Sequence, residues 1–367
     1  MRCGIEFEYL LWDLAGPEPG RLRDFTNLDF ATIAPLLEDK PGRDDPSLAS
    51  GDMGIRRGYW YLEGDERFHP DGSFSALIVK GVEIRTPPAP TVASAIESLL
   101  TIERELTRAL AAGGLALGIV GFNPLRPRYD FDPPLNDWER AERARDRSYD
   151  GTHVSTLSYG PDINLSHPDW TPEQCLDAAR KLNFYAPFIV PFSFSSPFYA
   201  GEIWDGPSKR TYERAAHRPA VKLYLEPGTH APSPLVGPPR LPSEIGRLEF
   251  KAFDAMPDLE VLTGCCHLLE GICLAEELPA RGETANLALY QRAALAGFED
   301  EWVRQGAMVL LVKAGQALRQ AGKPGAADAL APLERLVSER LTPAHALLRA
   351  YRESGWRWRP GGFAQTV

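Results

Sequence analysis

Four short segments share a pattern that constrains the fold: polar or charged residues at positions i and i+2, with apolar residues between them. In a β-strand, residues i and i+2 project to one face about 6.6 Å apart, while the intervening residues pack on the opposite face. Each segment therefore predicts a strand with one apolar and one polar face. The segments are Ile5-Glu6-Phe7-Glu8, Val82-Glu83-Ile84-Arg85, Asp162-Ile163-Asn164-Leu165 and Leu248-Glu249-Phe250-Lys251.

The polar faces of these segments carry mostly acidic side chains, and two interpretations are open. Any one segment is compatible with an ordinary half-buried strand whose polar face meets water. Together, the carboxylates could crowd onto one face of a sheet, where like charges raise each other's pKa unless a cation compensates them. Magnesium, which prefers oxygen ligands, would compensate them, and Arg85 and Lys251 on the same faces would serve a bound phosphate or carboxylate. The carboxylates are Glu6, Glu8, Glu83, Asp162 and Glu249.

Strand-like segments lie in the first two thirds of the 367-residue chain, and helical patterns dominate the last quarter. Helices are expected over 92–112, 171–190 and 259–277, followed by a helical C-terminal region over 284–355. This segregation predicts an α+β fold rather than alternating α/β units. The chain has no internal repeat and no low-complexity tract, so we expect a single domain, 1–367.

Composition argues against several classes of partner and location. The chain has 40 Lys and Arg against 50 Asp and Glu, a net charge of −10, which disfavours nucleic acid or an anionic membrane as the main partner. No apolar run approaches the roughly 20 residues of a membrane helix, and the first residues lack the unbroken apolar segment of a signal peptide. The five cysteines show no zinc-type spacing, so we expect reduced, buried thiols in a cytoplasmic protein.

Several common catalytic motifs are absent from the sequence, which contains no Walker loop, GxGxxG, GxSxG, HxH or HExxH. A zinc site built on histidines and a serine nucleophile are therefore disfavoured. A nucleotide would have to be held by the sheet rather than by a glycine-rich helix start.

Five stretches of the chain, in order, look like the motifs of one known family. They are Gly4-Ile5-Glu6-Phe7-Glu8, Glu83-Ile84-Arg85-Thr86-Pro87, Asp162-Ile163-Asn164-Leu165, Ser195-Ser196-Pro197-Phe198-Tyr199-Ala200-Gly201 with Ser208-Lys209-Arg210, and Arg247-Leu248-Glu249-Phe250-Lys251-Ala252-Phe253-Asp254. From residue 4 to about residue 275 the chain resembles the glutamate–cysteine ligase family, in particular its bacterial carboxylate–amine ligase and plant-type branch. The resemblance implies the fold of the glutamine synthetase catalytic domain, a curved antiparallel sheet with helices on its convex side. Lys251 stands where the family usually has Arg, and Asp162 where His or Gln is common.

The same resemblance implies an ATP- and Mg²⁺-dependent ligase that acts on small molecules. ATP would phosphorylate the side-chain carboxylate of glutamate or a similar acid, and an amine would displace phosphate from the acyl phosphate. Arg210 and Lys251 would contact the phosphates as catalytic residues, and Asn164 would help to bind the nucleotide. Arg85 and Arg247 would hold the substrate carboxylate, or else form surface salt bridges. The implied metal ligands are Glu6, Glu8, Glu83 and Glu249, with Asp162 as a fifth candidate.

Three functions remain open at this point. The resemblance favours a glutamate–cysteine ligase of glutathione biosynthesis. The same chemistry could serve another amine acceptor, either a different amino acid or a group on a carrier protein. A non-catalytic relative that binds nucleotide or acid is the third alternative, and a homo-oligomer is compatible with all three.

Overall fold

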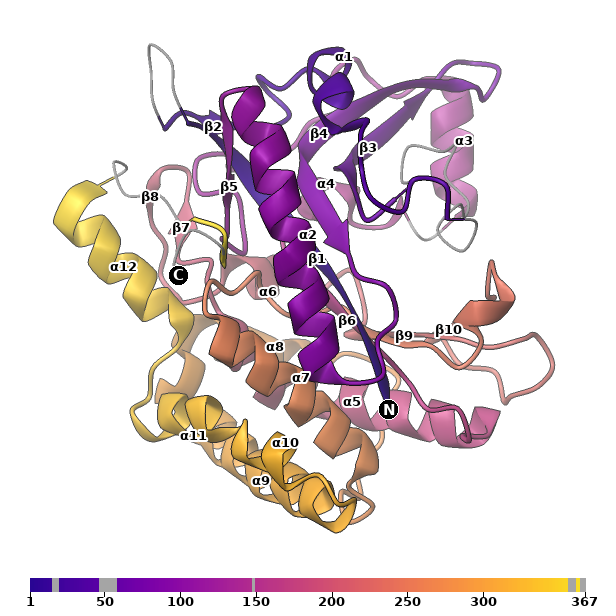
Figure 1. Ribbon diagram of the computed structural model, residues 1–367, viewed down its shortest axis with the longest axis vertical. Coiled ribbons are helices and arrows are strands. Elements are labelled where there is room, and N and C mark those ends of the chain that lie inside the picture. The colour runs from indigo at the N-terminus through magenta and orange to yellow at the C-terminus, as the bar shows by residue number, and fades with distance from the viewer. Residues whose placement is uncertain (15–19, 46–57, 147–148, 356–360, 364–367) are drawn as a thin grey trace.

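A curled β-sheet forms the centre of the protein in the computed structural model (Figure 1). The structure describes residues 1–14, 20–45, 58–146, 149–355 and 361–363. The strands of the sheet are β1 (Arg2–Asp13), β2 (Leu22–Arg23), β3 (Trp60–Phe68), β4 (Phe74–Arg85), β5 (Leu115–Gly118), β6 (Pro161–Ser166), β9 (Val221–Tyr224), β10 (Val236–Gly237) and β11 (Leu248–Phe250). They follow the order β10-β9-β11-β6-β1-β4-β3, and β2 and β5 pair with β1. All pairs in this sheet are antiparallel except β9 with β10.

The four segments singled out in the sequence lie in β1, β4, β6 and at β11, so the predicted strands are confirmed. In β1 the apolar residues Ile5, Phe7 and Tyr9 are fully buried. The intervening Glu6 and Glu8 are only half-buried and face the other side of the sheet. The alternation in the sequence therefore separates a hydrophobic core from a charged surface across one layer of strands.

Helices cover the hydrophobic face of the sheet. Not all of the helices lie on this face. The helices of the described residues are α1 (Phe30–Ile33), α2 (Val92–Ala112), α3 (Asp137–Arg145), α4 (Thr152–Ser155), α5 (Pro172–Ile189), α6 (Lys209–Arg214), α7 (Leu259–Leu274), α8 (Leu287–Ala296), α9 (Glu301–Gln320), α10 (Pro324–Asp328), α11 (Ala331–Ser338) and α12 (Pro343–Ser354). Helix α2 packs on β1, β4 and β5, α5 packs on β9 and β11, and α7 lies against both helices with α9 behind it. The expected α+β fold, with its helical C-terminal region, is confirmed.

The long helices begin where the sequence supplies a capping side chain. Thr91 and Thr171 each form a capping box at the start of α2 and α5, and the Asp258 carboxylate accepts from two backbone N–H groups of α7. The expected ranges agree with the structure, except that α7 ends at Leu274 rather than at residue 277, because Ala275 is extended.

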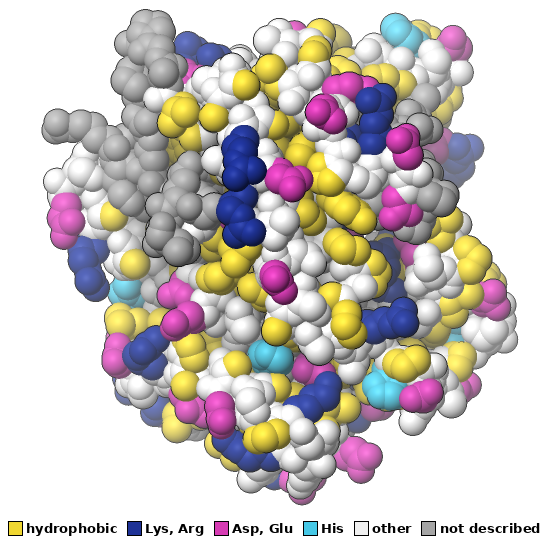
Figure 2. Space-filling view, in the orientation of Figure 1, with side chains coloured by type: hydrophobic (Ala, Val, Ile, Leu, Met, Phe, Trp, Pro, Cys, Tyr) yellow, Lys and Arg dark blue, Asp and Glu magenta, His cyan; other side chains and the backbone are white. Residues whose placement is uncertain are grey.

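Three further features concern the surface charge, the cysteines and the apolar character of the helices. Acidic and basic side chains are interspersed on the face shown in Figure 2. All five cysteines are buried free thiols, as expected. Among the described residues, no helix combines the length and the apolar character that crossing a membrane requires.

At Gly81, strands β1 and β4 approach each other too closely to admit a larger residue. A Cβ atom on Gly81 would lie 2.1 Å from the carbonyl oxygen of Tyr9 on the neighbouring strand. We expect Gly81→Ala to lower the free energy of unfolding by about 1–3 kcal/mol, because β1 and β4 must separate to admit the methyl group. Gly325→Ala is the matched control: no atom lies within 4 Å of its Cβ position, so urea denaturation should show no loss of stability, contrary to Gly81→Ala.

Candidate functional site

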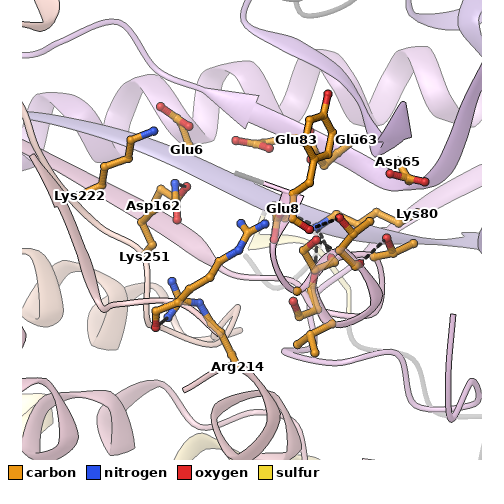
Figure 3. A pocket seen from close by; sticks show the side chains of 18 of the residues that line it. Glu6, Glu8, Glu63, Asp65, Lys80, Glu83, Asp162, Arg214, Lys222 and Lys251 are labelled. Atoms are coloured by element: carbon orange, nitrogen blue, oxygen red, sulfur yellow. Dashed lines mark hydrogen bonds and ion pairs between the residues drawn. The ribbon is translucent and has the colours of Figure 1, made fainter. Parts of the chain in front are cut away.

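A cavity of about 660 Å³ opens on the charged face of the sheet. Its volume falls within the range of small-molecule sites, about 300–1,000 Å³. Side chains from β1, β3, β4, β6 and β11 line one wall, and residues from α4, α6 and the loop after α6 line the wall facing it. Figure 3 shows the acidic side chains along the sheet with Lys80, Lys222 and Lys251 among them, and Arg214 approaching from α6.

Strand register brings the predicted acidic residues together. On the antiparallel ladder, Glu6 of β1 lies opposite Asp162 of β6, and Glu8 lies opposite Glu83 of β4. Glu249 of β11 lies one strand further, opposite Asn164. Directly opposed residues project to the same face of a sheet, so all five carboxylates line one cavity.

The carboxylates form two triads, whose ligand atoms lie within 4.8 Å of one another in each case. The first triad is Glu6, Asp162 and Glu249, and the second triad is Glu8, Glu63 and Glu83. Three carboxylate oxygens at this spacing are the donor type that Mg²⁺ accepts. The residues present therefore fit divalent cations.

Two basic side chains compensate the first triad. Lys251 Nζ contacts the Asp162 carboxylate and lies 3.0 Å from Glu249 Oε1. Arg247 Nη1 lies 3.4 Å from Glu6 Oε1. Burial alone would raise the pKa of Glu249, but the charges of Lys251 and Arg247 outweigh burial and lower it to about 2. Glu249 is therefore ionised and held by its cationic neighbours.

The second triad is less well compensated. Lys80 Nζ donates to Glu8 Oε1 at 2.5 Å, and the backbone N–H of Gly160 donates to the other oxygen at 2.8 Å. Glu83 is 6% exposed, and among the described residues no hydrogen bond or ion pair to its carboxylate is present. Burial raises the pKa of Glu83 well above its usual range, and the charge of Glu63 raises it further. A divalent cation here would relieve that repulsion.

Arginines at and after α6 form the wall opposite the carboxylates. Arg210 Nη1 donates to the Ala252 carbonyl at 3.0 Å, and Arg214 Nη2 donates to the Pro219 carbonyl at 3.1 Å. These bonds orient the guanidinium groups without neutralising them. Burial, and then the charges of Arg210 and Arg218, lower the pKa of Arg214 to about 9. An anion bound at this wall would be strongly favoured.

A buried carboxylate fixes this basic wall beside the sheet. Asp254 is completely buried and accepts from Ser196 Oγ at 2.5 Å and from Ser208 Oγ at 3.0 Å. Ser208 caps the start of α6, and Ser196 Oγ accepts from the backbone N–H of Arg210 at 3.2 Å. The serine-rich and Leu-Glu motifs of the sequence thus meet in one network that positions α6.

Seven of the ten predicted site residues line the cavity, and three do not. Asn164 lies beneath the cavity, donating to Glu6 at 3.2 Å and accepting from Arg247 at 3.0 Å. Arg85 points away, with its guanidinium over the Tyr61 ring and its Nε donating to a backbone carbonyl. Arg85, Asn164 and Arg247 are not among the lining residues, and the roles of all ten residues stay predictions. The seven predicted residues that line the cavity are Glu6, Glu8, Glu83, Asp162, Arg210, Glu249 and Lys251.

Sequence reasoning missed several lining residues, some of which follow the same alternation. Tyr61 and Glu63 of β3, and Lys222 and Tyr224 of β9, are i and i+2 pairs with an apolar residue between them. Lys80 gave no such signal, since a regular strand would place it on the face opposite Glu83. The register of β3 and β4 shifts between Glu63 and Gly64, which leaves Lys80 unpaired in the ladder, and a bulge of this kind re-aims a side chain.

Comparison with known structures shows that the fold of this chain is similar to the folds of two solved ligases. A bifunctional glutathione synthetase from Pasteurella multocida matches with a TM-score of 0.62 and 16% identity, over 100% of this chain and 52% of that one. A glutamate–cysteine ligase from Francisella tularensis, solved with AMP, matches with a TM-score of 0.56 and 11% identity, over 100% of this chain and 86% of that one. No family model matches the sequence, and a search of curated protein sequences finds no match. The resemblance seen in the motifs is confirmed at the level of the fold, and the chain spans about half the length of the Pasteurella enzyme.

Glu83 and Glu249 predict opposite effects of removing a carboxylate in metal-free buffer. The pKa of Glu83 is raised in the folded state. Glu83 therefore favours folding at low pH, where it is protonated, and loses this contribution to stability as pH rises through its folded-state pKa. Glu249 has a lowered pKa, so its contribution is present above the unfolded value and lost as pH falls.

We therefore expect Glu83→Gln to raise the free energy of unfolding at pH 7.5 or so, and the gain to shrink on acidification. Glu249→Gln should lower it by about 3 kcal/mol, the equivalent of moving a pKa from 4.5 to about 2. Urea denaturation of both variants between neutral pH and pH 4 or so provides the measurement. Destabilisation by both substitutions to the same extent would contradict this assignment of charge.

Proposed function

We propose that this protein is an ATP- and Mg²⁺-dependent ligase that joins the side-chain carboxylate of glutamate, or a similar acid, to an amine. The observation that carries the proposal is a cavity in which two partly buried carboxylate triads face the arginines of α6 and the loop after it. A nucleoside triphosphate with its bound metal has the complementary charge distribution, because the metal would face the carboxylates and the phosphate oxygens would face the arginines. The likeness in fold to two carboxylate–amine ligases supports this proposal.

Carboxylates of the triads would hold the metal, and bound Mg²⁺ supplies charge neutralisation between phosphate oxygens. Arg214 and Arg218 line the opposite wall and would bind the remaining phosphate oxygens. Lys222 reaches the cavity from β9 and extends the basic surface. These side chains orient the phosphates and keep water from competing for them, which is the main requirement of phosphoryl transfer.

The reaction would proceed in two displacements. A carboxylate oxygen of the acid attacks the γ-phosphorus of ATP, forming an acyl phosphate and releasing ADP. The amine nitrogen then attacks the acyl carbon, the C–O bond to phosphate breaks, and the amine loses a proton as the amide forms. The AMP complex of the Francisella enzyme supports a nucleotide site in this fold. Glutamate with cysteine, as in the first step of glutathione biosynthesis, is the acid–amine pair that the family resemblance favours.

Release of ADP in the presence of glutamate and Mg²⁺, across a panel of amines, tests this function. We expect release that requires all three components, with one amine giving much the strongest signal and a γ-glutamyl amide detectable by mass spectrometry. A response to cysteine alone identifies a glutamate–cysteine ligase, and a response to another amine reassigns the acceptor.

A thermal scan with Mg·ATP separates the remaining outcomes, since a ligand that binds only the folded state raises the melting temperature. A thermal shift without turnover of any amine would identify a non-catalytic nucleotide-binding relative. Neither a shift nor turnover would contradict the proposal altogether.

The arginine wall gives a further expectation. Arg214→Gln should weaken ATP binding at least about tenfold, because charge-assisted hydrogen bonds to phosphate contribute about 1.5–3 kcal/mol each. Arg104→Gln is the matched control, since Arg104 lies exposed on α2 and donates to Thr101. Isothermal titration with Mg·ATP measures both affinities, and equal affinities in the two variants would remove the phosphate-binding role from Arg214.

A further inference from the structure

The two carboxylate triads differ in how many of their carboxylates a basic side chain of the protein already contacts. In the first triad, Lys251 Nζ contacts the carboxylates of Asp162 and Glu249 directly. Its ammonium group is a compact charge with three N–H donors that contacts both carboxylates at once, and Figure 3 shows it beside Asp162. Arg247 contacts Glu6, the third member. All three carboxylates of this triad therefore have a cationic partner from the chain itself.

The second triad has the opposite character. Glu8 is bound to Lys80, but Glu83 is 6% exposed and accepts no hydrogen bond from the described part of the chain. A buried carboxylate aimed into a cavity, with repulsive neighbours and no donor, gains most from an external cation.

We propose that Lys251 takes the place of a divalent cation in the first triad, so that this protein binds a single tight divalent cation, at the second triad. The proposal rests on the metal dependence proposed above and assigns its stoichiometry. Mg²⁺ binds carboxylate oxygens at about 2.0–2.1 Å, and an ammonium nitrogen 3.0 Å from Glu249 Oε1 fills the space such an ion would need. It also repels the ion, since two cations at contact distance in a buried site interact strongly.

Lysine at this position has a second consequence for the chemistry. A metal ion in the first triad would exchange with solvent, whereas the Lys251 ammonium is tethered to β11 by a side chain beside Glu249. The first triad is then a permanent part of the cavity wall that presents N–H donors to an anionic substrate. The second triad alone responds to the concentration of free metal.

Titration with Mn²⁺, followed by the electron paramagnetic resonance signal of the free ion, tests the stoichiometry without relying on turnover. We expect one tight site in the unmodified protein. Asp162→Asn should leave that site in place, since it alters only the first triad, whereas Glu83→Gln should weaken it at least about tenfold by removing a charged ligand.

Lys251→Met should create a second Mn²⁺ site, at least about tenfold tighter than any second binding event in the unmodified protein, because the competing cation is gone. Lys222→Met is the matched control. Lys222 lines the same cavity and lies opposite Glu249 on the ladder, so its removal changes the net charge equally without vacating the triad. It should leave the number of sites at one.

The outcomes separate the inference from the function on which it rests. Two equal sites in the unmodified protein, or loss of a tight site in Asp162→Asn, would overturn the role of Lys251 while leaving metal binding intact. A second site in Lys222→Met as well would reduce the effect to general electrostatics and also overturn it. Absence of any Mn²⁺ binding, in every variant, would instead contradict the metal dependence of the proposed function.

Discussion

Repulsion between carboxylates on one face of the sheet is the constraint on which the rest of the structure depends. Six carboxylates in two triads lie within one cavity, and each raises the free energy of its ionised neighbours. A chain without compensation would protonate these groups or open the sheet. This protein instead supplies Lys251 and Arg247 to the first triad and Lys80 to the second. Among the described residues, no basic side chain contacts the carboxylate of Glu83, the buried member of the second triad.

The fold has to hold those compensating charges in place against its own repulsions. The ladder between β1 and β6 fixes Glu6 opposite Asp162, and a break in register aims Lys80 into the cavity. On the other wall, the buried Asp254 draws α6 against the end of β11 through serine hydroxyls. The carboxylates thereby gather on the sheet with their basic partners beside them, and Arg210 and Arg214 approach from α6, so that a ligand carrying both signs can contact both groups.

The sequence predicts the sheet well because alternation is a local signal. Each i and i+2 pair shows which residues share a face, and the four segments chosen from it lie in neighbouring strands. Strand register cannot be predicted from such a local signal, since the bulge that brings Lys80 to Glu8 depends on how β3 and β4 pair. Arg214 and Arg218 are equally hidden, because tertiary packing through Asp254 places them, whereas Arg210 is predicted only through the family resemblance. Arg85 shows the converse: it shares the strand face of Glu83, yet it does not line the cavity, and its guanidinium lies over the ring of Tyr61, which does.

Charge complementarity also explains why one wall alone would not suffice. Metal held by carboxylates without the arginines would leave the outer phosphate oxygens exposed to water, where hydrogen bonds are weak in net terms. Arginines without the carboxylates would bind any anion, with no means to orient it. Under the proposed function, the direction of the electrostatic field across the cavity would decide which end of the polyphosphate lies against the sheet. The part of the cavity lined by Tyr224 and Arg240 would then hold the acid whose carboxylate attacks the terminal phosphorus.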